Sequence, residues 1–142
     1  MLDWSKLLAG LPSGLRSELQ QAFDSISRNY VERRWEPSEL NGGKFCEVAY
    51  SIINGLVSGA MPAVASKPSN MAVACRALEQ TPANSARPGD HSIRVLIPRM
   101  LIAIYDVRNH RNVGHVGGDV DPNHSDATAV YMMASWVLAE LI

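Results

Sequence analysis

Apolar residues recur every three or four positions along most of this chain, which places them on one face of an α-helix. The spacing predicts long helices over residues 13–34, 39–58, 92–109 and 122–142, and a short one over 70–80. No segment alternates apolar and polar residues as a strand does. At 142 residues the chain has the size of one domain. We therefore expect a single all-α domain, an up-and-down four-helix bundle with an additional short helix.

Polar residues and prolines mark the expected helix ends. Ser13, Ser69 and Asp121 each precede an apolar pattern, where a side-chain oxygen can cap a helix. Pro122 follows Asp121, and proline is favoured at the first helical position. Pro98 lies early in the helix over 92–109, where it either kinks that helix or marks its true start.

Two adjacent glycines, Gly42 and Gly43, lie in the first turns of the second helix. Glycine lowers the intrinsic stability of a helix, but the missing Cβ lets another segment approach its backbone. The pair therefore allows a close contact with the backbone of this helix.

The last helix is apolar on nearly every side. Between Ala129 and Ile142 only Glu140 is charged. Such a helix needs a partner, which can be the rest of the core, a second subunit or further chain. We expect a homodimer formed through this helix, with the alternative that the chain is the N-terminal part of a longer protein.

The charge of the chain restricts its partners. The formal net charge is −1, so no overall basic field indicates a nucleic-acid binder. Ten of the thirteen basic residues are arginine, and five of these lie in residues 87–111. Arginine binds phosphate or carboxylate through two parallel N–H groups, so this bias favours a phosphate-facing or interface role. A GC-rich genome gives the same bias.

Several features indicate a cytoplasmic protein. Cys46 and Cys75 fall within helical patterns without metal-type spacing, which predicts buried thiols in a reducing compartment. The N-terminal residues lack the basic start and apolar core of a secretory signal. No stretch approaches the roughly 18 apolar residues of a membrane span, so we expect no membrane partner.

One polar segment, residues 105–124, interrupts this helical pattern with the letters YDVRNHRNVGHVGGDVDPNH. It contains three of the four histidines of the chain. Gly114, Gly117, Gly118 and Asn112 supply the residues that a turn between two helices needs. A turn alone does not account for arginine and histidine gathered between two apolar helices.

A metal site is one interpretation of this segment. His110, His115 and His124, with Asp119 and Asp121, are residues that can ligate zinc. Their spacing lacks the i, i+4 histidine pair found on helices that bind zinc. A phosphate loop of the mononucleotide-binding kind follows a strand, whereas this segment follows a helix. We therefore expect no metal and no cofactor.

General acid–base chemistry on phosphate is the third interpretation. Arg108 can bind a non-bridging phosphate oxygen and stabilise the charge that develops on phosphorus. His115 can exchange a proton with a ribose 2′-hydroxyl or a leaving 5′-oxygen near neutral pH. RNA supplies the 2′-hydroxyl as nucleophile, so neither a metal nor a protein nucleophile is required. A two-fold axis beside the segment would double these groups.

The segment RNHRNVGH resembles the motif of HEPN domains, in which an arginine and a polar residue precede a histidine by a few positions. Arg108, Asn109 and His115 stand at the motif positions. The motif of the family also lies between the penultimate and last long helices of an α-bundle. The sequence from 93 to 122, the last helix and LNGGKFCEVAY in the second helix are similar to bacterial HEPN proteins of the abortive-infection type, over about half of the chain.

The resemblance implies a metal-independent endoribonuclease of a phage-defence or toxin–antitoxin system. Such enzymes are usually homodimers whose motif loops face each other across the interface. Arg108 would stabilise the scissile phosphate, His115 would act as general acid or base, and Asn109 would orient the histidine or contact phosphate. The products would be a 2′,3′-cyclic phosphate and a 5′-hydroxyl. The expected partners are an RNA substrate and an antitoxin or further defence domain.

Four further residues are secondary candidates for binding RNA or phosphate: Arg111, Asn112, Lys44 and His124. Each of them can also be a solvated residue of a loop or helix surface without a function. Tyr105 is expected to lie in the core. Gly117 stands where some relatives carry a tyrosine that an antitoxin modifies, so that regulation is not expected. The alternative function is a catalytically silent HEPN domain that mediates dimerisation or senses a nucleotide or RNA within a larger defence protein.

Overall fold

The computed structural model describes residues 3, 6, 8–110 and 123–142, and these residues contain helices and no strand. The α-helices are α2 (Ser13–Val31), α3 (Trp35–Ser58), α4 (Met71–Gln80), α5 (Ile97–His110) and α6 (His124–Leu141). A short π-helix, η1 (Ser92–Leu96), leads directly into α5. The expectation of an all-α chain is confirmed for the described part of the chain.

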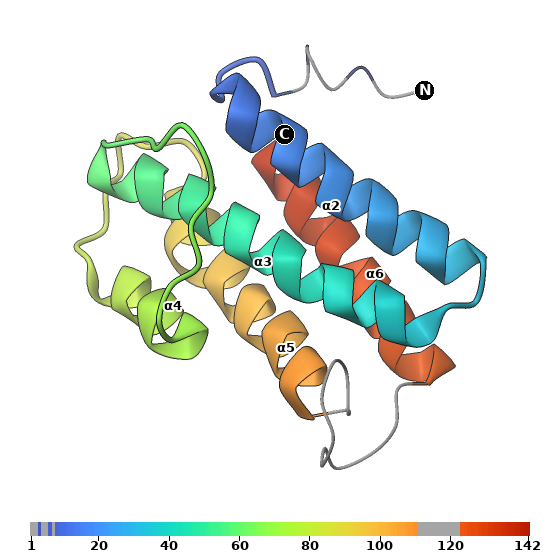
Figure 1. Ribbon diagram of the computed structural model, residues 1–142. Helices are drawn as coiled ribbons and strands as arrows, with labels where there is room; N and C mark the ends of the chain where they lie inside the picture. The colour runs from blue at the N-terminus through green and yellow to red at the C-terminus, as the bar shows by residue number, and fades with distance from the viewer. Residues whose placement is uncertain (1–2, 4–5, 7, 111–122) are drawn as a thin grey trace.

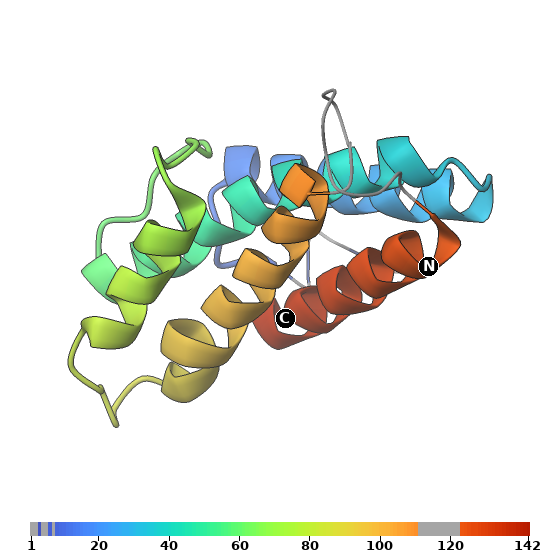
Figure 2. The same cartoon turned by 90° about the horizontal axis from the view of Figure 1, so that it is seen from below.

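Helix α3 is the centre of the structure and packs against α2, α5 and α6 (Figure 1). Helices α2 and α3 are antiparallel neighbours, as are α5 and α6, while the short α4 packs on the side of α5 (Figures 1 and 2). The fully buried large side chains come from α2, α3 and α5, and they are Leu15, Leu19, Ile26, Phe45, Val48, Ile52, Ile53, Ile97, Leu101 and Ile104. The helical spacing predicts most of them, but Leu56 of the same apolar stripe is exposed in the last turn of α3.

The predicted capping residues were wrong at three helix starts. Ser13 is the first residue of α2, and no side chain caps that helix. Asn70 caps α4 by accepting a hydrogen bond from the backbone N–H of Val73 at 3.1 Å. Asn123 caps α6 in the same way, and Asp121 and Pro122 lie outside the described residues. Several cap-forming residues stand side by side at these points, so local sequence alone does not choose among them.

The turn between α2 and α3 is shorter than the apolar pattern predicts. Helix α2 ends at Val31 rather than near Arg34, and α3 begins at Trp35. Pro37 is accommodated because the N–H groups of the first helical turn have no partner within the helix. The hydroxyl of Ser38, expected to precede the helix, lies inside it and donates to the buried carbonyl of Ile26 at 3.1 Å. This bond ties the start of α3 to α2.

Pro98 is the second residue of α5 and follows the π-helical turn. The backbone N–H of Ile97 donates to the carbonyl of Ser92, five residues earlier. Proline has no backbone N–H to donate, so the change to i→i−5 bonding occurs next to a position where one helical hydrogen bond is missing. Pro98 therefore lies within continuous helical backbone that begins at residue 90, directly after a π-turn and not at a helix start.

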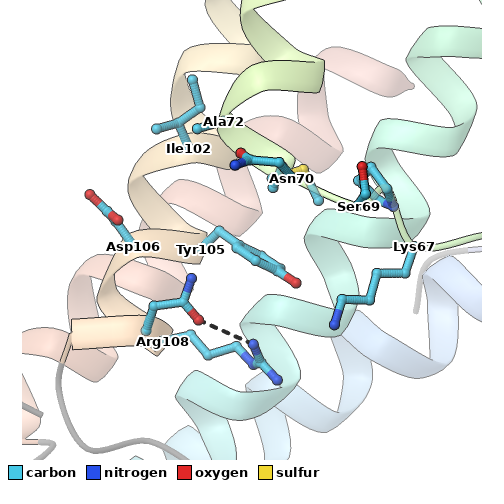
Figure 3. Close-up of a pocket in the computed structure, with 11 residues that line it drawn as sticks. Lys67, Ser69, Asn70, Ala72, Ile102, Tyr105, Asp106 and Arg108 are labelled. Atoms are coloured by element: carbon cyan, nitrogen blue, oxygen red, sulfur yellow. Dashed lines mark hydrogen bonds between the residues drawn. The ribbon is translucent and has the colours of Figure 1, made fainter.

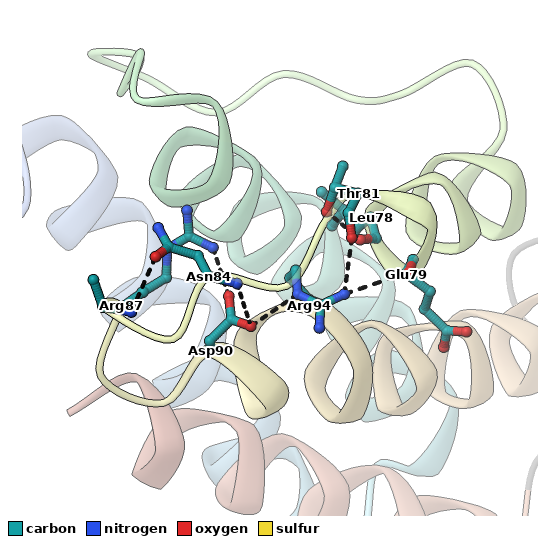
Figure 4. Close-up of polar contacts among 8 residues, drawn as sticks. Leu78, Glu79, Thr81, Asn84, Arg87, Asp90 and Arg94 are labelled. Carbon is teal, nitrogen blue, oxygen red and sulfur yellow. Dashed lines mark hydrogen bonds and ion pairs between the residues drawn. The ribbon is translucent and has the colours of Figure 1, made fainter.

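Three of the five arginines in residues 87–111 form ion pairs within the chain, and Figure 4 shows two of them, Arg87 and Arg94, around Asp90. Arg87 and Arg94 both bind the carboxylate of Asp90, at 2.8 and 3.0 Å, and Arg99 binds Glu79 at 2.7 Å. Burial acts to raise the pKa of Asp90, but the bonds from Arg94 and from a backbone N–H outweigh it, so the pKa is lowered. The arginine bias of this segment is therefore largely structural.

Replacing Arg94 by alanine is expected to lower the free energy of unfolding by about 2 kcal/mol. Arg94 is 9% exposed, and it also donates to the carbonyls of Thr81 at 3.0 Å and Glu79 at 3.4 Å. Its loss removes the donor of both carbonyls and one of the donors to Asp90, which keeps its bonds to Arg87 and to the backbone N–H of Asn84. Urea denaturation measures the change, and Arg99→Ala is the control, because an exposed ion pair contributes much less. Equal stabilities of the two variants would contradict the structural role of Arg94.

The apolar residues of α6 are divided between the core and the surface. Ala127, Val130, Ala134, Val137 and Leu138 are buried. Met132 of α6 and Ile142, which directly follows the helix, are in contrast 63% and 51% exposed. Among the helices of the described residues, none combines the length and the apolar character that crossing a membrane requires.

Candidate functional site

The structure describes four of the seven candidate site residues. Arg108 and Asn109 lie in the last turn of α5, Lys44 lies on α3, and His124 is the first residue of α6. The remaining three, His115, Arg111 and Asn112, lie outside the described residues.

Arg108 crosses the backbone of α3 at Gly43. A Cβ on Gly43 would collide with Cδ of Arg108 and lie 2.7 Å from its Nε. At Gly42 a Cβ would lie 2.7 Å from Cγ1 of Val130 and 3.3 Å from Cγ2 of Ile104. The close backbone contact that this glycine pair allows is present, and the two glycines have different neighbours. Gly42 admits core side chains, whereas Gly43 admits the candidate catalytic arginine.

Two further contacts orient the guanidinium of Arg108. It lies 5.4 Å from the ring centroid of Tyr105, a distance at which a cation is attracted to the face of an aromatic ring. Its Nη1 also donates to the Asn109 side-chain oxygen at 3.3 Å. The hydroxyl of Tyr105 in turn donates to the carboxylate of Glu47 on α3 at 3.0 Å. Burial and this hydrogen bond raise the pKa of Tyr105, so the phenol stays protonated and positions the ring.

A cavity of about 360 Å³ opens beside Arg108 (Figure 3). Its walls are the segment before α4, the first turn of α4, and the last two turns of α5. The side chains of Lys67 and Arg108 extend toward one another from opposite walls, with Tyr105 between them. The residues that line it are Lys67, Pro68, Ser69, Asn70, Met71, Ala72, Ile102, Tyr105, Asp106, Arg108 and Asn109.

The electrostatics of this cavity favour an anion. Lys67 and Arg108 bring two cations to it, against the single carboxylate of Asp106. Met71 and Ala72 are the first two residues of α4, where backbone N–H groups and the helix dipole present partial positive charge. A phosphate group of an extended ligand matches this combination of charges. Arg108 is also the one arginine of α5 that, within the described residues, pairs with no carboxylate.

Reasoning from sequence missed Lys67, Asn70 and Tyr105 as site residues. Lys44, the lysine that was expected, is exposed on α3 and does not line the cavity. Lys67 takes that place from the loop before α4. A basic residue shortly before a helix start was the available signal, because the free N–H groups of a helix start favour anions nearby. Tyr105 is half-buried and lines the cavity, so its assignment to the core was incomplete.

His124 does not line the cavity at Arg108 and packs at the start of α6 instead. Its ring stacks on Trp35 with 4.9 Å between centroids and 26° between planes. Its Nε2 lies 3.4 Å from the hydroxyl of Tyr30. His124 therefore belongs to a separate aromatic cluster.

Two other kinds of site have little support in the described part of the chain. No group of three His, Cys, Asp or Glu side chains that could hold a metal ion occurs there. The candidate zinc ligands His115, Asp119 and Asp121 lie outside it. Cys46 and Cys75 are buried free thiols, as the sequence predicts, and burial raises the pKa of Cys75 to about 12. A buried thiol with a raised pKa is not an effective nucleophile.

Comparison with family models, with curated proteins and with solved structures finds no match for this chain, so the residues themselves carry the functional argument.

Proposed function

We propose that this chain is a metal-independent endoribonuclease of the HEPN kind, acting as a homodimer in a phage-defence or toxin–antitoxin system. One observation carries the proposal. Arg108, the arginine of the HEPN-like motif, lies in the groove left by Gly43 and lines a cavity whose charges suit a phosphate. Of the two arginines of α5, Arg99 pairs with Glu79, whereas Arg108 pairs with no carboxylate of the described residues and faces the cavity.

The proposed reaction uses the substrate's own nucleophile. The 2′-oxygen of the ribose attacks the adjacent phosphorus, a 2′-O–P bond forms and the P–O5′ bond breaks. His115 takes the proton of the 2′-hydroxyl or gives one to the leaving 5′-oxygen, and its counterpart in a second subunit supplies the other transfer. Arg108 binds a non-bridging oxygen and stabilises the charge on the pentavalent phosphorus. Asn109, bonded to Arg108, holds the guanidinium in place.

A dimer supplies the second set of catalytic groups. The surface of α6 supports this part of the proposal, because Met132 is exposed on that helix and Ile142 directly follows it. Burial of such side chains against a second copy removes apolar surface from water. The bundle would then be HEPN-like, with the motif segments of two copies facing each other.

The test is RNA cleavage in excess EDTA. We expect the wild type to cut single-stranded RNA and to leave 2′,3′-cyclic phosphate and 5′-hydroxyl ends. RNA with 2′-O-methyl groups should remain whole, because it lacks the nucleophile, and His115→Ala should be inactive. Cleavage that requires added metal, proceeds on the 2′-O-methyl RNA or survives the His115 substitution would contradict the proposal.

A catalytically silent HEPN domain is the second candidate. The same exposed apolar residues, Met132 on α6 and Ile142 after it, favour it, since they could pack against another domain as well as against a second copy. In that case the cavity at Arg108 would bind a nucleotide or RNA without cutting it. Binding of 2′-O-methyl RNA by a protein that leaves ordinary RNA whole would distinguish this candidate from the nuclease.

A further inference from the structure

A second cavity, of about 330 Å³, lies where the turn between α2 and α3 meets the start of α6. Tyr30, Val31, Arg33, Trp35 and His124 line it. Its volume is at the lower end of the range for small-molecule sites, enough for one flat group. It is separate from the cavity at Arg108, since the two share no lining residue.

Three rings of this cavity are held in place by α6. The hydroxyl of Tyr30 is 3.0 Å from the hydroxyl oxygen of Thr128, and its ring packs edge-on against Tyr131 at 4.8 Å. Trp35 then packs on Tyr30 at 5.8 Å and stacks on His124. Trp35 is only half-buried, and His124 is exposed. The rings therefore form a packed aromatic surface that solvent reaches.

Arg33 has the one positive φ among the non-glycine residues of the described chain, at 60°. The N–H of Arg33 donates to the carbonyl of Tyr30 at 3.0 Å, and the N–H of Arg34 donates to that of Asn29 at 2.8 Å. This is the hydrogen-bond pattern of a Schellman motif, in which the residue with positive φ is usually glycine. An arginine there holds a strained backbone conformation, and such residues gather at functional sites. Its side chain is exposed and lines the cavity.

We propose that this cavity binds one unpaired nucleotide of a single-stranded RNA, with the base stacked on the Trp35–His124 pair and the phosphate held by Arg33. Aromatic faces that hold bases and a cation that follows the backbone are the two parts of single-strand binding sites. The cation also excludes the main alternative, a positively charged ligand in an aromatic cage, because Arg33 would repel it. Bases within a duplex are stacked on one another and cannot enter the cavity.

The RNA in question is that of the proposed nuclease, so the inference rests on that function and specifies its substrate as single-stranded. The end of α5, the start of α6 and the turn between α2 and α3 lie at the same end of the molecule (Figures 1 and 2). Trp35 and Gly43 both belong to α3, and the eight residues from one to the other span about 12 Å along the helix axis. That distance corresponds to a few nucleotides of a strand.

The experiment measures binding of a fluorescently labelled 2′-O-methyl hexa-adenylate by anisotropy, so that cleavage plays no part. The comparison ligand is a ribose-phosphate chain of equal length without bases. We expect the wild type to bind the hexa-adenylate at least tenfold more tightly than the abasic chain. Trp35→Leu should weaken hexa-adenylate binding about tenfold, and Trp35→Phe, which keeps an aromatic face, should retain most of the affinity.

Arg33→Gly tests the phosphate contact without disturbing the fold, because glycine suits a positive φ. We expect weaker binding, a slope of log affinity against log salt that is smaller by about 0.7, and an unchanged or higher melting temperature. Arg34→Ala is the matched control. Arg34 is the neighbouring arginine, is paired with Glu32 at 3.2 Å and does not line the cavity, so its loss should change the affinity little.

Equal affinity for the abasic chain, an unchanged affinity in Trp35→Leu, or an equal loss in Arg33→Gly and Arg34→Ala would overturn the inference. These outcomes are distinguishable from failure of the proposed nuclease. If the protein cuts RNA but neither Trp35 nor Arg33 affects binding, the proposed nuclease function stands and the proposed nucleotide site is wrong. If the protein binds the hexa-adenylate through both residues but cuts no RNA, the proposed nucleotide site stands and the proposed nuclease function is wrong.

Discussion

Replacing Arg108 by alanine is expected to lower the rate of RNA cleavage by about 100- to 1,000-fold, the usual effect of removing one group that stabilises charge in a transition state. Arg108 is half-buried and its guanidinium is held by Tyr105 and Asn109, so it has little to reorganise when charge develops on the phosphate. Arg108→Lys should recover only part of the rate. Lysine keeps the charge but lacks the planar fork that binds two oxygens and stacks on an aromatic ring.

The measurement is the single-turnover cleavage rate in excess EDTA, together with the affinity for 2′-O-methyl RNA. A loss confined to the rate indicates a group that acts in the transition state, whereas an equal loss of affinity indicates a group that binds substrate. Arg99→Ala is the matched control, because Arg99 lies on the same helix but is paired with Glu79. If Arg108→Ala cleaves RNA at the wild-type rate, Arg108 is not a catalytic residue, and the motif resemblance no longer supports the proposed function.

The helices could be predicted from the sequence because burial repeats with the helical period. Leu15, Leu19 and Ile26 follow that period on α2, and all three are fully buried. The ends of the helices follow no such rule. Asn70 caps α4 although Ser69 beside it is as good a cap by type, and packing decides between them.

The candidate site was predictable only where its residues are neighbours in sequence. Arg108 and Asn109 were identified because they adjoin each other in a recognisable motif. Lys67 lies in the connection between α3 and α4 and lines the same cavity as Arg108 only because α4 packs on α5. Periodicity and motif spacing carry no information about such contacts.

The sequence does not predict the strained turn at Arg33, for a different reason. The usual signal for a residue of positive φ at the end of a helix is glycine, and this turn has none. The apolar pattern of α2 also continues through Tyr30, so the sequence predicts a helix that runs to about Arg34. Sequence rules thus fail at the place where an unusual residue occupies a glycine position, and sites of function are where such departures concentrate.

Gly43→Ala provides the sharpest test of how Arg108 is held. The new Cβ would occupy the space of Cδ of Arg108, a flexible side chain that can move aside without disturbing the core. Alanine also favours a helix over glycine by about 1 kcal/mol, so the protein should be at least as stable as the wild type. The guanidinium, however, is displaced by an ångström or more, which is enough to lower the rate of a positioned reaction by roughly 100-fold.

The matched control, Gly42→Ala, should have the opposite profile. Its Cβ would meet Val130 and Ile104, β-branched side chains of the core that cannot move freely. Overpacking of this kind costs about 1–3 kcal/mol, which outweighs the gain in helix propensity, so the free energy of unfolding should fall. Urea denaturation and the cleavage rate of the folded protein are measured on both variants. Because the two glycines are adjacent and receive the same methyl group, full activity in Gly43→Ala would show that the cleavage does not depend on where Arg108 lies.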